Sequence, residues 1–599
     1  MTEFLSTALL HRISRCLFVL GIVGFTALLF GCGGGSSSGT NIAPNSASAS
    51  SLFSPSSTQA SSSNTDSSAA VSSSAELSSA SSISSIASSA SSGLIVISGQ
   101  ITYDFIPHDE SDNGLDYAAT TTMPVRGLVV ELLDANNNIL SSSITTTNGD
   151  YSFTVTRDLP VRVRVKAQLV SPQINNQASW NFKVTDNTSN NDLYAMNGSL
   201  LVAAPSTAVR NLHAASGWTG NAYTQPRIAA PFAILDAIYT GLERLLSADN
   251  SVQLPSLELR WSPNNITADG ELDLGEIGTS FYRDDLNAIY LLGGQDEDTD
   301  EYDRHVILHE WGHYIEAKLS RSDNIGGDHQ GDDKLDMRVA MSEGFANAFS
   351  AMLLDDPVYR DASGEAQASG FQITVNRINN AVRGWYSEAS IQSVLYNFYT
   401  SDNNKTARNF SDIFTIIRRE NYRSSDAFVS VYLFAEQLRL AMPAVSVGFN
   451  SLLTGQNIAI TDRFGSGESN SGGAVANLPV YKNLPVNNTS VNVCSSNENG
   501  SYNKLGVSQF LLLNIVSSGR YELKATASPQ GASVSDPDLY LYQQGQLIAQ
   551  AESATADDET INRFLSVGTY ILEVVEASAL DSDVSASVDQ CFNVRALPN

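Results

Sequence analysis

The stretch His309-Glu310-Trp311-Gly312-His313 decides the fold at the centre of this chain. On a helix the two histidines lie one turn apart on the same face, so both imidazoles can face one metal ion. Glu310 lies about 100° round the helix from His309, where it can act without being a ligand. Zinc hydrolases use this arrangement: two neutral nitrogens hold Zn²⁺, the ion lowers the pKa of a water molecule, and the carboxylate takes the proton. The stretch therefore predicts a zinc site with His309 and His313 as ligands and Glu310 as catalytic base.

The surrounding residues predict that this stretch is helical. Residues 301–320 contain no proline, and their apolar side chains recur at helical spacing. Asp and Thr residues at positions 298–300 offer N-caps just before it. Gly312 in mid-helix costs about 1 kcal/mol relative to alanine, which indicates that another element packs closely there. The apolar positions are Val306, Ile307, Leu308, Ile315 and Leu319.

A catalytic zinc needs a third protein ligand, and Glu343 is the favoured candidate. Residues 339–353 read as a second helix, and the chain between the two helices is long enough for a connector and a return. Glu343 would then face the first helix in a hairpin. Asn347, one turn further on, is placed to hydrogen-bond a ligating histidine and fix its tautomer.

Other side chains remain open as alternatives to Glu343. Any of four aspartates in the connector could be the third ligand, and Glu388 is a weaker alternative. His305, one turn before His309, is expected to pack or to support a ligand rather than to bind the metal. The connector aspartates are Asp328, Asp332, Asp333 and Asp336.

Hydrolysis of an amide also calls for a group that stabilises the oxyanion. Tyr386 and His329 are the candidates, and the sequence does not choose between them. For His329 an exposed position in a loop is the plainer interpretation.

These residues resemble the gluzincin metallopeptidases, whose pattern is His-Glu-x-x-His with a glutamate on a following helix. Glu343-Gly344-Phe345-Ala346 is similar to the aminopeptidase branch. The long connector with Gly326-Gly327 and the Ser-Glu-Gly sequence are more similar to the bacterial collagenase branch. The resemblance covers roughly residues 300–350. It implies that His309, His313 and Glu343 bind zinc and that Glu310 is general base and acid, and it fixes no substrate.

The N-terminus is typical of an exported protein. Basic residues precede an apolar run at residues 17–30, which is short for a membrane span and suits a signal-peptide core. The run ends in Gly31-Cys32, which resembles a bacterial lipoprotein cleavage site and implies lipidation of Cys32; an ordinary signal peptide is the alternative. Gly33 stands where an Asp would retain the protein at the inner membrane, so the resemblance implies an outer-membrane anchor on a Gram-negative cell surface. Residues 33–93, rich in Ser and Ala, predict a flexible linker.

Cysteines and charge agree with export. Of four cysteines, Cys494 and Cys591 lie outside the leader and are expected to form one disulfide in an oxidising compartment. The net charge of −29 argues against nucleic acid as a partner. The acidic excess is also suited to Ca²⁺, with residues 296–300 and 328–336 as the places to look, although a solvated run of charge is the plainer interpretation.

The rest of the chain predicts a multidomain α+β protein. Residues 94–199 should form a β-sandwich, because Val161, Val163 and Val165 alternate with basic residues. The sequence around Gly149 resembles the turn of transthyretin-like or carboxypeptidase-regulatory-like sandwiches. Residues 200–465 should form a zincin-like metallopeptidase domain, whose edge strand could pair with an extended substrate.

A Gly/Ser/Asn-rich linker at residues 466–484 leads to a second β-sandwich at residues 485–599. The motifs Asp536-Pro537-Asp538-Leu539 and Gly568-Thr569-Tyr570 resemble the pre-peptidase C-terminal family. That resemblance implies an accessory domain that accompanies proteolytic domains and is often processed away.

The sequence therefore favours a zinc-dependent peptidase, most simply an endopeptidase, that acts on proteins or peptides at the cell surface. A non-catalytic surface binding or adhesion protein that keeps a zincin scaffold is the alternative. A zinc hydrolase of a non-peptide bond shares the same motif.

Overall fold

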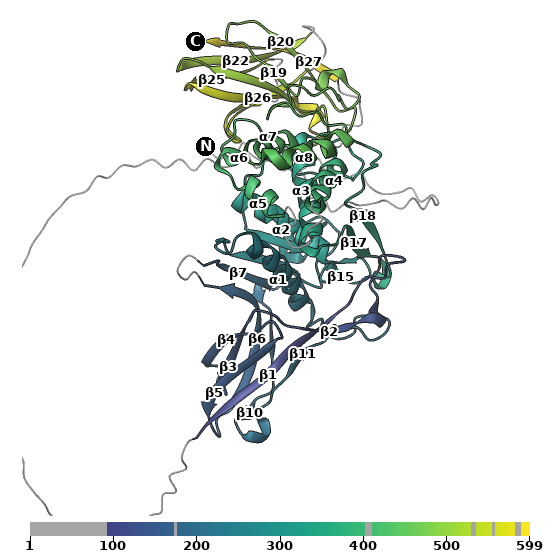
Figure 1. The fold of residues 1–599 in the computed structure, drawn as a ribbon, viewed down its shortest axis with the longest axis vertical. Coiled ribbons are helices and arrows are strands. Elements are labelled where there is room, and N and C mark those ends of the chain that lie inside the picture. The colour runs from purple at the N-terminus through teal and green to yellow at the C-terminus, as the bar shows by residue number, and fades with distance from the viewer. Residues whose placement is uncertain (1–92, 173–176, 402–409, 529–534, 554–557, 582–588) are drawn as a thin grey trace, which may run out of the picture.

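The computed structural model describes residues 93–172, 177–401, 410–528, 535–553, 558–581 and 589–599. The predicted signal peptide, Cys32 and nearly all of the linker lie outside these residues. Strands occupy both ends of the long axis of the molecule, and the helices lie between them (Figure 1). No helix in the described ranges has both the length and the apolarity to cross a membrane.

The N-terminal part is built from strands, as predicted. Every second residue of β5 (Asp150–Thr156) and β6 (Pro160–Ser171) is buried, which confirms the inward face that the valines of β6 predict. One sheet has the order β11-β1-β2, with β5 also paired to β1, and a larger sheet contains β6. The other strands here are β1 (Leu94–Phe105), β2 (Thr121–Pro124), β3 (Leu128–Asp134), β4 (Ile139–Ile144), β7 (Trp180–Asp186), β8 (Asp192–Leu193), β9 (Ala195–Asn197), β10 (Leu201–Val202) and β11 (Leu212–Ala214).

The larger sheet continues across the predicted domain boundary at residue 199. Strand β7 pairs in parallel with β12 (Leu257–Trp261), and the order along the sheet is β13-β14-β12-β7-β6-β3-β4. Helix α1 (Ala230–Ala248) packs on β6 and β7 and also on α2. The N-terminal strands and the central helices therefore share one hydrophobic core. The remaining strands of this sheet are β13 (Phe281–Arg283), which forms its edge, and β14 (Ala288–Leu291).

Two buried helices form the centre of the molecule. Helix α2 (Arg304–Leu319) confirms the helix predicted around His309, and α3 (Met337–Leu354) confirms the second one. They pack closely at Gly312, where a Cβ atom would lie 3.2 Å from Ala346 Cα, as the mid-helix glycine indicates. The connector, which we define as residues 320–336, joins them.

Further helices and a small sheet surround this pair. The helices are α4 (Glu388–Thr400), α5 (Phe410–Ile417), α6 (Glu420–Arg423), α7 (Val431–Ala441) and α8 (Pro443–Gly455). The small sheet has the order β15-β16-β17-β18 and consists of β15 (Gly293–Gly294), β16 (Asp298–Thr299), β17 (Val358–Ser363) and β18 (Ser369–Thr374).

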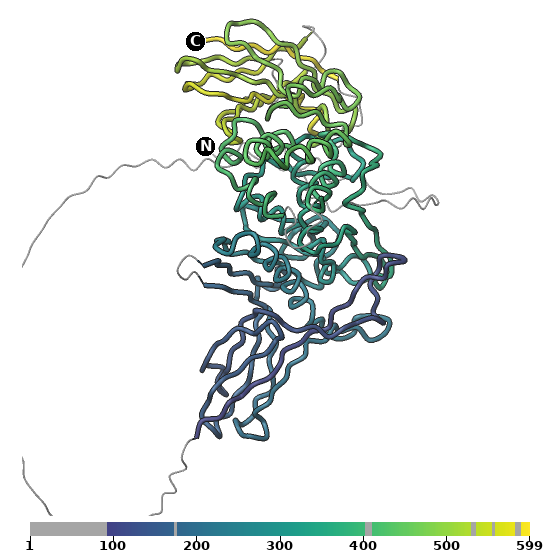
Figure 2. Tube along the Cα trace, viewed as in Figure 1, coloured from purple at the N-terminus to yellow at the C-terminus, as the bar shows by residue number. Residues whose placement is uncertain are grey.

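The C-terminal part is a β-sandwich with its own core, which agrees with the predicted second sandwich. Its sheets have the orders β19-β21-β26-β23-β24 and β20-β27-β22-β25. A disulfide joins Cys494 to Cys591 on neighbouring strands, which confirms the predicted pair. Figure 2 shows this part stacked on the central helices. Its strands are β19 (Tyr481–Asn483), which begins inside the predicted linker, β20 (Val491–Ser496), β21 (Gln509–Ile515), β22 (Gly519–Ser528), β23 (Pro537–Gln543), β24 (Gln546–Ala551), β25 (Asp558–Leu565), β26 (Gly568–Glu576) and β27 (Asp589–Pro598).

Candidate metal centre

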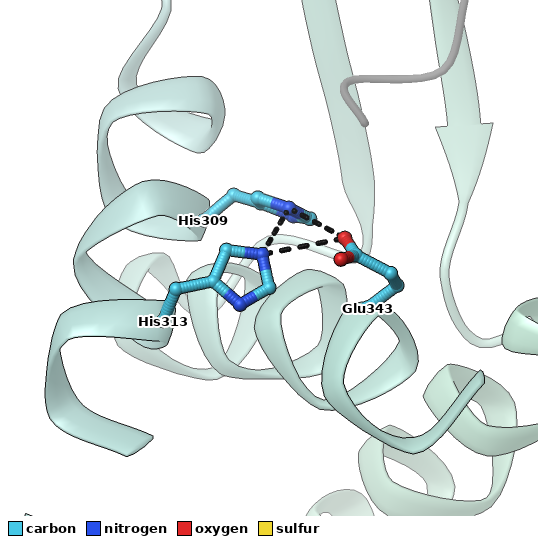
Figure 3. Close-up of side chains that lie close together, drawn as sticks. All are labelled: His309, His313 and Glu343. Atoms are coloured by element: carbon cyan, nitrogen blue, oxygen red, sulfur yellow. Dashed lines mark hydrogen bonds and ion pairs between the residues drawn. The ribbon is translucent and has the colours of Figure 1, made fainter. Parts of the chain in front are cut away.

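Helices α2 and α3 bring His309, His313 and Glu343 together (Figure 3). The Nε2 atoms of both histidines lie 3.3 Å from Glu343 Oε2 and 3.1 Å from each other. All three side chains are buried. The candidate ligands named from the sequence therefore converge on one point between two packed helices.

Asn347 fixes the tautomer of His309. Its Nδ2 donates to Glu388 Oε1 at 2.6 Å and to Gln392 Oε1 at 2.9 Å, which directs its carbonyl oxygen toward the imidazole. That oxygen lies 2.8 Å from His309 Nδ1 and can only accept, so Nδ1 carries the proton. Nε2 then keeps its lone pair free, on the side where the three candidate ligands converge. The contact predicted between Asn347 and a histidine is confirmed.

A second relay orients His313, and sequence reasoning missed it. Ser342 Oγ lies 2.5 Å from Glu316 Oε2 and 3.2 Å from His313 Nδ1. Burial raises the pKa of Glu316 to about 7, and the hydrogen bond from Ser342 opposes that shift. With Glu316 ionised, Ser342 donates to it and accepts from His313 Nδ1, which leaves Nε2 free to bind a metal. The spacing of His313 and Glu316 on one helix face was the available signal.

We expect Ser342→Ala to weaken zinc binding by about 10- to 100-fold, because His313 loses the group that holds its ring and tautomer. Competition with a chelating zinc indicator measures this directly. Ser350→Ala is the matched control: Ser350 is buried on the same helix, and its hydroxyl donates to the backbone oxygen of Asn347. Equal zinc affinities in the two variants would contradict the relay.

Glu310 lies beside the cluster without joining it. Its Oε1 is 3.9 Å from His309 Nε2, and the side chain is fully buried. Within the described ranges neither carboxylate oxygen has a hydrogen-bond partner at good geometry, although a contact with the backbone of Tyr282 lowers the pKa of the group. Burial raises the pKa of this carboxyl group, while the imidazoles of His309 and His313 oppose the rise. A buried carboxylate with a raised pKa and free oxygens suits a group that accepts and returns a proton.

The donor atoms fit a zinc ion. Glu343 Oε2 is buried and, among the described residues, has no hydrogen-bond donor that meets it at good geometry. Burial disfavours the charged form of Glu343, but the histidines facing it outweigh this and hold its pKa well below the usual range. Its other oxygen, Oε1, accepts a hydrogen bond from Asn324 Nδ2 at 2.9 Å. Two imidazole nitrogens and one carboxylate oxygen form the ligand set that many zinc enzymes use.

His329 corrects one expectation, because it is buried rather than exposed. Its Nε2 lies 3.6 Å from Glu343 Oε2 and 3.5 Å from Glu388 Oε2, and its Nδ1 lies 3.1 Å from the carbonyl oxygen of Gly327. Burial alone would lower the pKa of His329, but the two carboxylates raise it. The other candidate for oxyanion stabilisation, Tyr386, is engaged elsewhere, with its hydroxyl 3.0 Å from Asn470 Oδ1.

The rival ligands in the connector lie outside the cluster, and two of them have structural contacts. Within the described ranges, the group that contains His309 and His313 includes Glu343 and none of the connector aspartates. Asp336 caps α3 and pairs with Arg338. Asp333 lies 3.4 Å from Lys504 Nζ.

His305 packs instead of binding at the cluster, as expected. Its ring lies against Tyr359, and its Nε2 is 3.3 Å from the carbonyl oxygen of Asp356. Burial lowers the pKa of His305 to about 4, so it is neutral at ordinary pH. Glu388, the weaker alternative ligand, holds Asn347 and faces His329.

A cleft of about 1280 Å³ reaches the cluster. His313 and Glu343 lie in its wall together with Tyr282 of the edge strand β13. Asn324 of the connector and Gln546 of the C-terminal sandwich line it as well. An extended chain in this cleft would therefore meet the edge of the large sheet and also the second sandwich.

A second acidic group lies near the start of α2. Carboxylate oxygens of Asp298, Asp300, Asp303 and Asp361 lie within 4.8 Å of one another. Burial and then the neighbouring carboxylates raise the pKa of Asp298 and Asp300 well above the usual range. His108 Nε2 lies 2.9 Å from Asp303 and opposes the rise that burial causes in the pKa of Asp303.

This group draws on one of the two runs that the sequence proposed for Ca²⁺. Residues 296–300 contribute to it, whereas residues 328–336 contribute to no comparable group in the described part of the chain. The group is of a kind that can hold a metal ion. Occupation by Ca²⁺ stays a prediction.

Comparison with known proteins supports a relation to peptidases. Residues 248–444 match the family model of the mycolysin C-terminal domain, a range that contains Glu310 and all three candidate ligands. A search of curated proteins finds no match. Among solved structures, the pre-peptidase C-terminal domain of a Bacillus anthracis collagenase is 12% identical and covers 19% of this chain and 93% of its own, with a TM-score of 0.14. The Aeromonas hydrophila PliG, a periplasmic lysozyme inhibitor of g-type lysozyme, is 14% identical to this chain. The match covers 19% of this chain and 96% of PliG, with a TM-score of 0.13. TM-scores this low carry no argument, so the family match alone indicates a peptidase-related protein.

Proposed function

We propose that this protein is a zinc-dependent peptidase, an endopeptidase whose central domain is a zincin. One observation carries the proposal: two imidazoles with fixed tautomers and one carboxylate converge beside a cleft, which His313 and Glu343 line, and the buried carboxylate of Glu310 lies next to them. The mycolysin family match over the same residues supports it. The fit of the donor set favours zinc over the hard cations that prefer oxygen ligands alone.

His309, His313 and Glu343 would hold the ion. Zinc bound there supplies a Lewis acid and lowers the pKa of a water molecule in the cleft. Asn347 and the Ser342–Glu316 relay keep both imidazoles in the tautomer that a metal requires.

Glu310 would move the protons. Because its oxygens have no hydrogen-bond partner at good geometry in the described part of the chain and its pKa is raised, it can take a proton from the attacking water and pass it to the leaving amine nitrogen. His329 would donate a hydrogen bond to the carbonyl oxygen of the scissile bond as negative charge develops there. The carbonyl oxygen of Gly327 lies 3.1 Å from Nδ1 of this ring, so Nε2 is the nitrogen that would donate to the substrate.

Strand β13 would bind the substrate backbone. It is the edge of the large sheet, β14 is its one strand neighbour among the residues that the structure describes, and Tyr282 on it lines the cleft. An extended peptide can add to such an edge through main-chain hydrogen bonds, which bind without regard to side-chain identity.

We place the protein at the bacterial cell surface, exported and lipid-anchored through Cys32 in the outer membrane. The leader and the serine-rich residues 33–93 support this placement. A linker of that composition would hold the folded part clear of the bilayer.

Metal analysis of residues 94–599, together with an assay on a mixed peptide library, tests the proposal. We expect about one zinc per chain, peptide hydrolysis that stops when a chelator removes the metal, and recovery when zinc is restored. A protein with neither zinc nor hydrolysis, but with affinity for a surface glycan or protein, would be the adhesion protein of the alternative hypothesis.

A further inference from the structure

We infer that the C-terminal sandwich is a working part of the active site, because its latch loop holds the connector against Glu343. The latch loop is residues 497–507, which follow β20. This inference rests on the proposed function for its catalytic consequence. It differs from what the pre-peptidase resemblance implies, namely a domain that can be removed.

The latch loop and the connector pair through their backbones. Asp336 N donates to Asn503 O at 2.8 Å, and Leu505 N donates to Lys334 O at 2.8 Å. Leu335 and Lys504 form an antiparallel bridge between these two bonds. The end of the connector, just before α3, therefore runs as a short strand beside the sandwich.

Side chains of the latch loop then cap the middle of the connector. Asn503 Nδ2 donates to the carbonyl oxygens of Gly326 at 2.9 Å and Gly327 at 2.8 Å, and Asn503 is buried. Tyr502 donates from its hydroxyl to the carbonyl oxygen of Ile325 at 2.8 Å. Three consecutive connector carbonyl groups thus find their donors on the sandwich, and these donors would be lost if the sandwich moved away.

The fit between the two segments is close. Gly327 has φ of +96°, and a Cβ atom there would lie 2.5 Å from Tyr502 Cδ1. The neighbouring Gly326 has φ of +67°, but a Cβ atom there would meet nothing within 4 Å. At the start of the connector, a Cβ atom on Gly545 in the β23–β24 turn would lie 2.4 Å from Arg321 Nε. The sandwich therefore touches the connector at both ends.

A buried ion pair ties the same sandwich to helix α3. Arg338, five residues before Glu343 on the same helix, donates to Glu573 of β26 at 2.7 and 3.1 Å. Its guanidinium also lies over the rings of Phe428 and Phe510. This pair holds helix α3 and strand β26 together, because separating two buried charges would leave each of them without a partner and without water.

The latched connector carries two groups that touch Glu343. Asn324 Nδ2 donates to Glu343 Oε1, which leaves Oε2 turned toward the histidines. His329 Nε2 faces Oε2 from the other side of the same connector. Asn503 is thus a positioning residue: it acts on Glu343 through the connector and does not reach the metal site itself.

Asn503→Asp in the full-length protein tests the latch. The substitution keeps the shape of the side chain, removes both N–H donors and sets a negative charge against two carbonyl oxygens. Asn499→Asp is the matched control, because Asn499 makes its bond to Leu505 O inside the latch loop. Three quantities are compared: hydrogen exchange of the connector amides, the rate of zinc transfer to a chelator, and kcat and KM for a peptide.

We expect faster exchange at Leu335 and Asp336 in Asn503→Asp, and zinc transfer about 10-fold faster or more, as for the loss of other groups that orient a ligand. The fall in kcat/KM should lie mainly in kcat, since the cleft wall at β13 is unchanged. A general loss of folding would instead expose amides throughout the sandwich.

Two glycine variants give an independent comparison. Both Gly326→Ala and Gly327→Ala place a side chain on a left-handed backbone, but only the second collides with the latch loop. Zinc transfer should be faster in Gly327→Ala than in Gly326→Ala.

The inference is wrong if Asn503→Asp leaves the hydrogen exchange of the connector amides unchanged. If hydrogen exchange of the connector rises while zinc transfer and kcat stay at wild-type values, the latch loop holds the connector but does not position Glu343. That result also overturns the inference. If the wild-type protein binds zinc and hydrolyses no peptide, the proposed function fails, while exchange and zinc transfer still decide the latch.

Discussion

Replacing Glu310 by alanine is expected to leave zinc bound and to lower peptide hydrolysis by about 10²- to 10⁴-fold, the usual contribution of a general base. The carboxylate is fully buried, and in the described part of the chain its oxygens make no hydrogen bond of good geometry, so its removal costs the fold at most the weak contact with the backbone of Tyr282. Zinc should stay because Glu310 is no member of the group formed by His309, His313 and Glu343. Zinc content and kcat, measured on the same preparation, separate the two effects.

The isosteric Glu310→Gln variant is the control for shape. Glutamine fills the same space and cannot take a proton, so it should lose as much activity as alanine does. Peptide turnover at the wild-type rate in either variant would refute the mechanism. A loss of zinc in both would instead place Glu310 among the ligands.

Replacing His313 by alanine should remove zinc and activity together. Its Nε2 is one of the three converging donor atoms, and only two would remain to hold the ion. Excess zinc in the assay should restore little of the peptide hydrolysis, because two remaining ligands leave the metal with an incomplete coordination shell. Metal analysis after dialysis, followed by the peptide assay with and without added zinc, measures both losses.

His305→Ala is the matched control for that variant. His305 lies on the same helix and is also buried, but it contacts Tyr359 and the backbone of Asp356 rather than the cluster. We expect lower stability from the lost packing, with zinc content kept at the wild-type level. Loss of zinc in His305→Ala as well would mean that damage to α2, and not loss of a ligand, explains the His313 result.

The two central helices could be predicted because their signals are local. Helical spacing puts His309 and His313 on one face whatever else surrounds them. The glycine at position 312 indicated close packing, and Ala346 of the second helix packs there. Asn347 lies one turn beyond Glu343, where it reaches His309. The disulfide between Cys494 and Cys591 followed by elimination, since no other cysteine lies beyond the leader.

Other parts of the site depend on contacts between segments far apart in the chain. The burial of His329 was not predicted, because a polar connector reads as solvent-exposed until something covers it. The C-terminal sandwich holds the connector two residues before His329, through a bond from Asn503 to Gly327 that spans 176 residues. The sheet that joins β7 to β12 likewise crosses the boundary that local strand and helix patterns predicted at residue 199.

The sequence by itself determined the type of centre: which residues can hold a metal, which carboxylate stands beside them, and which helices carry them. Only the tertiary structure decided how that centre is supported, through the Ser342–Glu316 relay, the placement of Asn324 and His329, and the docked sandwich. The physical reason is range. Helical periodicity depends on residues that are close in sequence, so it can be recognised in a short stretch of the chain. The hydrogen-bond donors that satisfy the carbonyl groups of a buried loop can come from any segment that the fold places beside it.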